Sequence, residues 1–219
     1  MAKRIGVLLA GSGYLDGAEI HEATLALYFL DKAGADIVCM APNIAQAEVV
    51  DHWTGKPTGE IRNVLVESAR IARGKIRDVA TLDENELDAL LIPGGFGAAK
   101  NLCTFAMDGP DCVVDVGVAT LVRALHANKK PIGALCIAPS LVARLLGQTH
   151  QVALTIGSDA ATATALEAMG AKHLDRSVDA LAIDEANRVV STPCYMLARG
   201  PAEVGAGVEK LVTQLLAWV

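Results

Sequence analysis

Cys136 stands at a junction where a thiol could act as a nucleophile. In the stretch GALCIAPS (133–140) it follows an apolar run, 131–135, that predicts a buried strand, and a helix-like stretch begins two residues later. Ala134 and Ala138 are the small residues that a strand-to-helix nucleophile turn needs. Because N–H groups at a helix start stabilise a thiolate, we expect a lowered thiol pKa and fast alkylation. A small buried core residue is the other interpretation, and the spacing alone favours the two about equally.

Two carboxyl groups are candidates for the acid or base that tunes such a thiol. Glu19 and Glu22 lie in the first turn of a helix predicted over 19–34, and their spacing places them on one face. One or both could contact the thiol, since a reactive cysteine needs such a partner. The alternative is that both merely complement the helix dipole. His21, between them, is expected to face elsewhere.

Two glycine-rich stretches follow predicted strands. PGGFG (93–97) comes directly after an apolar run, where backbone N–H groups can face a ligand and form an oxyanion hole; a tight turn is the equally favoured alternative. Lys100 and Asn101 follow this turn and are candidates to line the same pocket. GSGYLDG (11–17) has Asp16 where a dinucleotide-binding fingerprint needs its third glycine, so we expect no nucleotide cofactor.

The remaining cysteines and histidines predict neither a disulfide framework nor a metal site. The five cysteines are odd in number and include no C-x-x-C spacing, so we expect no metal. We interpret the other four cysteines as structural and none of the remaining histidines as catalytic. These residues are Cys39, Cys103, Cys112, Cys194, His52, His126, His150 and His173.

Composition limits the class of protein. The 219 residues are 52% hydrophobic with a net charge of −6, which suits one large domain over 1–219. The sequence has no basic stripe or lysine run, so a nucleic-acid partner is not expected. The N-terminal apolar run after Lys3 and Arg4 is too short for a membrane span and lacks a signal-peptide cleavage site. It predicts a first strand, no membrane partner and a cytoplasmic protein.

Strand-like and helix-like periodicities alternate along the chain. Continuous apolar runs at 4–10, 36–42 and 87–95 are typical of buried parallel strands, and helical spacing separates them. The alternation predicts a mainly parallel sheet with helices on both faces, an α/β sandwich. The stretch 43–60 is the least regular and predicts a surface insertion. In such a sheet ligands bind beyond the carboxyl ends of the strands, where Cys136 and the glycine stretches are expected to converge.

A family resemblance is carried by three stretches: GAEIHEATLALYFLDKAGADI (17–37), LDALLIPGGFGAAKNL (87–102) and GALCIAPSLVARLL (133–146). They resemble the PfpI-type superfamily, whose class I glutamine amidotransferase-like fold is shared by intracellular proteases, deglycases and cofactor-independent glyoxalases. Within it, nearly the whole chain looks like the ElbB group of isoprenoid biosynthesis proteins with an amidotransferase-like domain. The resemblance implies a flavodoxin-like three-layer α/β/α sandwich and a homodimer.

The resemblance also implies roles for individual residues. Cys136 matches the nucleophile, and Glu22 rather than Glu19 matches the carboxyl that hydrogen-bonds it. Glu19 remains a candidate for the substrate pocket. The backbone positions that match the oxyanion donors are Gly94, Gly95 and Ile137.

Departures from the family pattern shape the functional expectation. STPCYML (191–197) has no histidine where an amidotransferase triad has one, and VALTIGSD (152–159) has none where deglycase-type members often do, so glutaminase activity is not expected. A cysteine with a glutamate and no histidine predicts a slow, cofactor-independent lyase of the glyoxalase III type. Its substrate would be a small reactive carbonyl, glyoxal or methylglyoxal, and its product glycolate or lactate. A deglycase-type activity is also possible for such a site. The alternatives are a non-enzymatic redox or stress regulator, or an accessory protein of isoprenoid biosynthesis.

Overall fold

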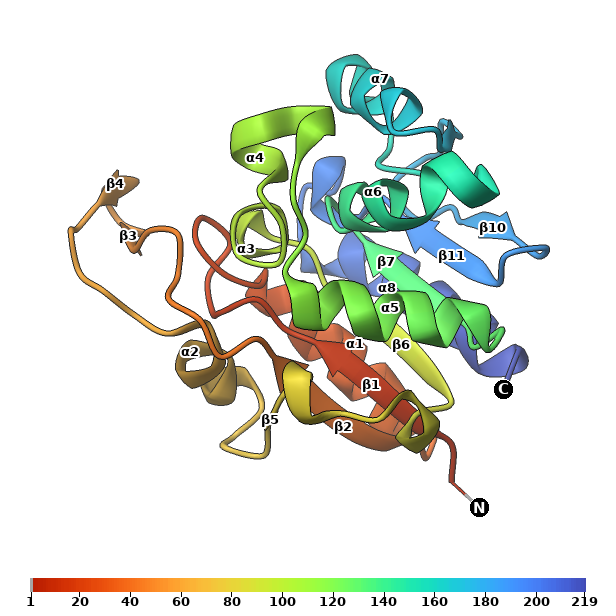
Figure 1. The fold of residues 1–219 in the computed structure, drawn as a ribbon, viewed down its shortest axis with the longest axis horizontal. Coiled ribbons are helices and arrows are strands. Elements are labelled where there is room, and N and C mark those ends of the chain that lie inside the picture. The colour runs from red at the N-terminus through yellow and green to blue at the C-terminus, as the bar shows by residue number, and fades with distance from the viewer. Residues whose placement is uncertain (1) are drawn as a thin grey trace.

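A mainly parallel sheet forms the centre of the fold in the computed structural model, which describes residues 2–219 (Figure 1). Within these residues the sheet has seven strands, and only the β10–β11 pair is antiparallel. In spatial order the strands are β10 (Ala182–Asp184), β11 (Val189–Thr192), β7 (Ile132–Leu135), β6 (Ala89–Ile92), β1 (Arg4–Leu8), β2 (Asp36–Ala41) and β5 (Arg77–Asp78). The predicted α/β sandwich is confirmed.

Helices cover both faces of the sheet. In Figure 1, α5 (Val116–Ala127) and α6 (Pro139–His150) lie in front of the sheet, and α1 (Ile20–Lys32) and α8 (Pro201–Ala217) lie behind it. Side-chain caps define where the helices start: the Asp115 carboxylate, for example, accepts the N–H of Val118 at the start of α5. The other helices are α2 (Val64–Ile71), α3 (Phe96–Lys100), α4 (Phe105–Asp108) and α7 (Ala160–Ala168).

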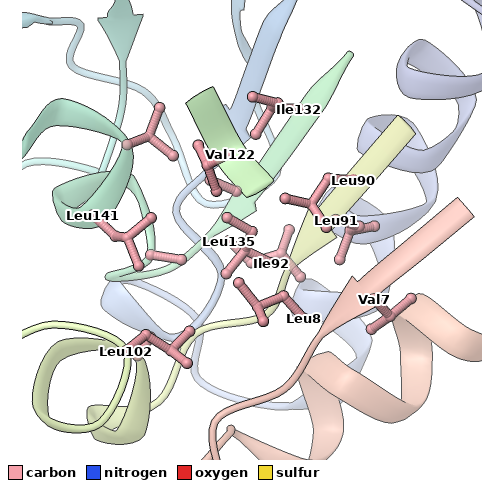
Figure 2. Packing of buried hydrophobic residues seen from close by; sticks show 14 of the residues in the cluster. Val7, Leu8, Leu90, Leu91, Ile92, Leu102, Val122, Ile132, Leu135 and Leu141 are labelled. Atoms are coloured by element: carbon pink, nitrogen blue, oxygen red, sulfur yellow. The ribbon is translucent and has the colours of Figure 1, made fainter. Parts of the chain in front are cut away.

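The core lies on both sides of the sheet because the central strands are apolar on both faces. Val7 pairs in parallel register with Leu91, and Leu91 pairs with Gly133, against which α8 packs. Side chains alternate along a strand, so Val7 and Leu91 face α8 while Leu90 and Ile92 face α5 and α6. All four are fully buried, and Figure 2 shows them on their neighbouring strands.

Two short strand pairs lie apart from the main sheet, one antiparallel and one parallel. The irregular stretch 43–60 contains β3 (Val50–Asp51) and β4 (Lys56–Pro57), which extend away from the body of the molecule in Figure 1. β8 (Ala153–Leu154) and β9 (Lys172–His173) form a second small sheet. The sequence did not predict α3 and α4, because helices of five and four residues are too short to show helical periodicity.

Removing a core side chain tests both the packing and the prediction of a single domain. We expect Leu91→Ala to lower the free energy of unfolding by about 2–5 kcal/mol, because a fully buried leucine leaves a cavity. Met107→Ala, at an exposed site on α4, should change it by less than about 0.5 kcal/mol. Urea unfolding followed by circular dichroism and fluorescence measures both, and two separate transitions would contradict a single domain.

Candidate active site

Cys136 comes directly after β7, at the carboxyl edge of the sheet. Its backbone φ is +58°, in the left-handed region that residues with a side chain rarely adopt. α6 begins at Pro139, so the chain passes from strand to helix within residues 136–138. This confirms the predicted strained turn. Cys136 is 7% exposed, so a small part of it remains accessible.

The carboxyl group of Glu22 is fully buried beside this thiol. Its Oε2 accepts the N–H of Gly94 at 2.8 Å, and its Oε1 accepts the N–H of Tyr195 at 3.2 Å. The side chains of Glu22 and Cys136 hydrogen-bond each other, as the sequence predicted. One carboxyl therefore connects α1, the loop after β6, the loop after β11 and the turn after β7.

The backbone N–H groups of the two glycines after β6, Gly94 and Gly95, have different hydrogen-bond partners. The N–H of Gly95 and the N–H of Ile137 hydrogen-bond the sulfur of Cys136, whereas the N–H of Gly94 is donated to Glu22. A Cβ at Gly94 would lie 2.4 Å from the Cβ of Cys136, and Gly95 has a φ of +90°. Both positions need glycine because the thiol and the start of α1 approach this backbone closely.

Burial is the main cause of the raised pKa values of Glu22 and Cys136. Loss of water raises the pKa of Glu22 from an ordinary 4.5 to about 8, with repulsion from Glu19 as the second cause, and outweighs the backbone N–H donors. The pKa of the Cys136 thiol is also raised, first by burial and then by Glu22. The prediction of a lowered thiol pKa is therefore wrong, because two N–H groups and a helix start do not offset the burial of the thiol.

Lys100 and Asn101 brace the loop that precedes α1. Asn101 Nδ2 donates to the carbonyl oxygen of Asp16 at 2.8 Å, and Lys100 Nζ donates to the carbonyl oxygen of Leu15 at 3.2 Å. The Lys100 ammonium also pairs with the Glu48 carboxylate. Neither side chain borders the cavity beside the thiol, so the structure places them behind the site rather than in it.

Cys194 is the residue that sequence reasoning missed. It follows β11, which runs parallel to β7 with Thr192 paired to Leu135, so Cys136 and Cys194 leave the ends of adjacent strands. Cys194 also has a left-handed φ, +45°, and the N–H of Cys136 is donated to the carbonyl of Thr192, two residues before Cys194, at 3.0 Å. Burial raises the thiol pKa of Cys194. The signal in the sequence was its place two residues beyond the strand that neighbours the nucleophile.

Tyr195 connects the site to a histidine. Its ring borders the cavity beside Cys136, and its hydroxyl hydrogen-bonds His21 Nδ1 at 2.6 Å. Of the residues that the structure describes, no histidine borders this cavity. His21 therefore reaches the site only through the tyrosine, which the sequence did not predict.

An open cavity of about 410 Å³ borders the thiol, and Glu19 is part of its wall. Apart from this glutamate and one threonine, its side chains are apolar or aromatic. Its lining residues are Tyr14, Glu19, Gly95, Phe96, Ala99, Phe105, Ala106, Cys136, Ile137, Thr162, Tyr195 and Met196.

The glycine stretch before α1 is closed on itself rather than open to a phosphate. The N–H of Gly13 is donated to the carbonyl of Ala18, and the N–H of Gly17 to that of Gly13. Across residues 2–219, no group of three His, Cys, Asp or Glu side chains is placed to hold a metal ion. In the same part of the chain, no helix combines the length and apolar character that crossing a membrane requires.

A cysteine in a strained turn at the edge of a parallel sheet, with a buried glutamate beside it, is the arrangement that the resemblance to class I glutamine amidotransferase-like proteins of PfpI type implied. The chain belongs to the glutamine amidotransferase-like class 1 domain family. The human protein "Glutamine amidotransferase-like class 1 domain-containing protein 3, mitochondrial" is 44% identical over 225 residues, covering 98% of this chain and 83% of the human protein. The rat "ES1 protein homolog, mitochondrial" is 43% identical over 223 residues, covering 97% and 83%. No protein-family model matches the chain.

Solved structures agree with this assignment. An isoprenoid biosynthesis protein with an amidotransferase-like domain from Ehrlichia chaffeensis has a TM-score of 0.91 and 37% identity, with 99% of this chain and 100% of that chain covered. The predicted resemblance to the PfpI-type superfamily and its flavodoxin-like fold is thus confirmed. Glyoxalase III from Candida albicans has a TM-score of 0.63 with 97% of each chain covered; at 12% identity it shows a shared fold alone.

The prediction of a cytoplasmic protein is wrong. The human, rat and zebrafish relatives all carry names that place them in mitochondria. Composition and a short apolar run at the N-terminus describe how the chain folds, whereas a compartment is specified by separate targeting signals.

The raised pKa of Glu22 predicts a pH-dependent stability. The carboxyl binds its proton more tightly when folded, with a pKa of about 8, than when unfolded, with an ordinary value of 4.5. Its stabilising contribution is complete below the unfolded value and is lost as the pH rises through the folded value. Across this window we expect the free energy of unfolding to fall by several kcal/mol relative to that of Glu22→Gln.

Chemical denaturation of both proteins at several pH values measures this difference. Glu167→Gln, which changes an exposed carboxyl on α7, is the matched control and should keep the slope of the wild-type protein. Equal pH slopes for the wild-type protein and Glu22→Gln would show that the carboxyl does not retain its proton in the fold.

Proposed function

We propose that this chain is a cofactor-independent glyoxalase that converts 2-oxoaldehydes, of which glyoxal and methylglyoxal are the simplest, to 2-hydroxy acids. The observation that carries the proposal is the buried hydrogen-bonded pair of Cys136 and Glu22, which opens on a cavity that no histidine borders among the described residues. A carboxyl with a pKa of about 8 is matched to proton transfer near neutral pH.

The first step joins the thiol to the aldehyde carbon. The Glu22 carboxylate takes the proton of Cys136 as the sulfur forms a bond to that carbon, and it returns the proton to the carbonyl oxygen. The product is a hemithioacetal. The N–H groups of Gly95 and Ile137, which hydrogen-bond the sulfur, stabilise negative charge as it develops there.

The second step is an internal oxidation and reduction that needs no external electron carrier. Glu22 removes the hydrogen of the aldehyde carbon as a proton, which gives an enediol, and delivers the proton to the neighbouring carbon. The hydroxyl proton moves to the other oxygen, so the aldehyde carbon becomes a thioester and the ketone becomes an alcohol. Water then breaks the carbon–sulfur bond, releases the 2-hydroxy acid and returns a proton to Cys136.

A glutaminase mechanism is less well supported. It needs a base that takes the thiol proton and then protonates a leaving amine, the task of histidine in a triad. Cys194 lies beside Cys136 instead, and a buried thiol with a raised pKa is a poor replacement for imidazole. The names of the curated relatives describe a domain resemblance and no reaction.

Replacing the thiol is the direct test of the proposal. We expect Cys136→Ala to lose all turnover of methylglyoxal above the uncatalysed rate, and Glu22→Gln to lose about a hundredfold or more. Cys39→Ala, at a buried cysteine on β2, should retain most of the activity and controls for the loss of a core thiol. The wild-type rate should rise as the pH approaches about 8, since Glu22 acts as a base. Full turnover of methylglyoxal by Cys136→Ala would contradict the proposed thiol mechanism.

The position of Cys136 and Cys194 at the ends of adjacent strands favours a second candidate function, redox regulation. A peroxide would oxidise Cys136 to a sulfenic acid and water, and Cys194 would displace a second water to form a disulfide. Mass spectrometry of peroxide-treated protein would detect the 136–194 cross-link. A cross-link without any glyoxalase turnover would favour this alternative. An accessory role in isoprenoid biosynthesis, suggested by the name of the Ehrlichia chaffeensis protein, is distinguished in the same way by turnover.

We also propose that the chain is a homodimer. Trp53, between β3 and β4, is 94% exposed, and Ile61, which follows β4, is 90% exposed. Exposed apolar side chains that gather on one segment often mark a site of protein association. Light scattering should give twice the chain mass for the wild-type protein and the mass of one chain for Trp53→Ser. A wild-type monomer would contradict the proposal.

A further inference from the structure

We propose that the substrates of this site are 2-oxoaldehydes with a bulky, uncharged aromatic or branched alkyl group, and that glyoxal, methylglyoxal and anionic dicarbonyls are poorer substrates. This inference rests on the proposed function, because it names the substrate class of the same thiol. It comes from the size, the chemistry and the charge of the cavity that borders Cys136.

The size of the cavity exceeds what the simplest dicarbonyls need. Its volume of about 410 Å³ lies within the range of roughly 300–1,000 Å³ that is common for sites of drug-sized ligands. Glyoxal and methylglyoxal consist of a few heavy atoms and would leave most of this space to water. A larger substituent would replace that water and add apolar contact area.

The chemistry of the walls matches a flat or branched apolar group. Four aromatic rings border the cavity, from the loop before α1, from α3, from α4 and from the turn after β11. They are Tyr14, Phe96, Phe105 and Tyr195. Met196 adds an adaptable apolar side chain, and aromatic pairs stack favourably beyond their buried area. A ring on the substrate could therefore pack against several protein rings at once.

The charges around the cavity oppose an anion. Among residues 2–219, no lysine, arginine or histidine borders it, and Glu19 is its charged side chain. The nearby cation, Lys100, lies over the ring of Phe96 at 5.0 Å but is already paired with the Glu48 carboxylate. A carboxylate on the substrate would be desolvated without a partner, which is costly.

The phenyl and carboxyphenyl forms of one 2-oxoaldehyde provide a matched test. Steady-state kcat/KM is measured for phenylglyoxal, methylglyoxal and 4-carboxyphenylglyoxal. We expect phenylglyoxal to exceed each of the others by about tenfold or more. Phe96→Ala should lower the ratio of phenylglyoxal to methylglyoxal, since the ring is 47% exposed and borders the cavity. Tyr28→Ala, an exposed aromatic on α1, should leave this ratio unchanged.

A second measurement keeps the inference separate from the proposed function. Alkylation rates of Cys136 by N-phenyl iodoacetamide, iodoacetamide and iodoacetate are measured by mass spectrometry and divided by the rates for glutathione. We expect the normalised rate to fall from N-phenyl iodoacetamide to iodoacetamide to iodoacetate, with the neutral aromatic reagent about tenfold or more faster than the anion. If no dicarbonyl is turned over but this order holds, the glyoxalase proposal fails and the apolar preference stands.

The opposite result is equally informative. If methylglyoxal or the carboxylate is turned over as well as phenylglyoxal, the substrate class is wrong while the glyoxalase function stands. If no dicarbonyl is turned over and the three alkylating reagents react at equal normalised rates, both proposals are overturned.

Discussion

The buried contact between the Glu22 carboxyl and the Cys136 thiol constrains the structure around it. A carboxyl without water is costly unless it is neutral and hydrogen-bonded, and Glu22 meets both conditions. It accepts N–H groups from Gly94 and Tyr195, which belong to loops after two different strands. The same positions direct the backbone after β6 and β7 toward the sulfur. The geometry of the thiol therefore follows from the need to satisfy one carboxyl.

The two glycine-rich stretches support this contact by holding each other. The N–H of Glu19 is donated to the carbonyl of Gly94 at 2.9 Å, and the N–H of Phe96 to that of Tyr14 at 2.7 Å. Glycine is needed where the backbones approach, as at Gly95, whose Cβ would lie 2.4 Å from the N of Glu19. These glycines therefore serve close packing between two loops, and the packing places aromatic side chains around the cavity.

A carboxyl and two thiols lie at this site, and among the described residues no histidine borders its cavity. Histidine transfers protons near neutral pH because its ordinary pKa lies there. The pKa of Glu22 approaches neutral pH only because the carboxyl is buried away from water. Cys194 shares the strained backbone of Cys136 and the same desolvated surroundings. A site of this kind suits chemistry in which one proton is moved between neighbouring atoms, and it also holds two thiols that peroxide could join.

The sequence by itself predicted the order of strands and helices from apolar periodicity, and the small residues around Cys136 indicated a strand-to-helix turn. Both patterns act locally along the chain. The family resemblance, rather than a spacing, indicated that Glu22 is the carboxyl beside the thiol. Only the tertiary structure decided the protonation of Cys136, the placement of Cys194 and the position of Lys100 behind the site. Each depends on burial and on contacts between segments far apart in the sequence, such as β7 with β11. The periodicity of a sequence indicates which residues are buried, but it does not indicate which buried side chains contact one another. Those contacts determine the pKa values of the groups in the site.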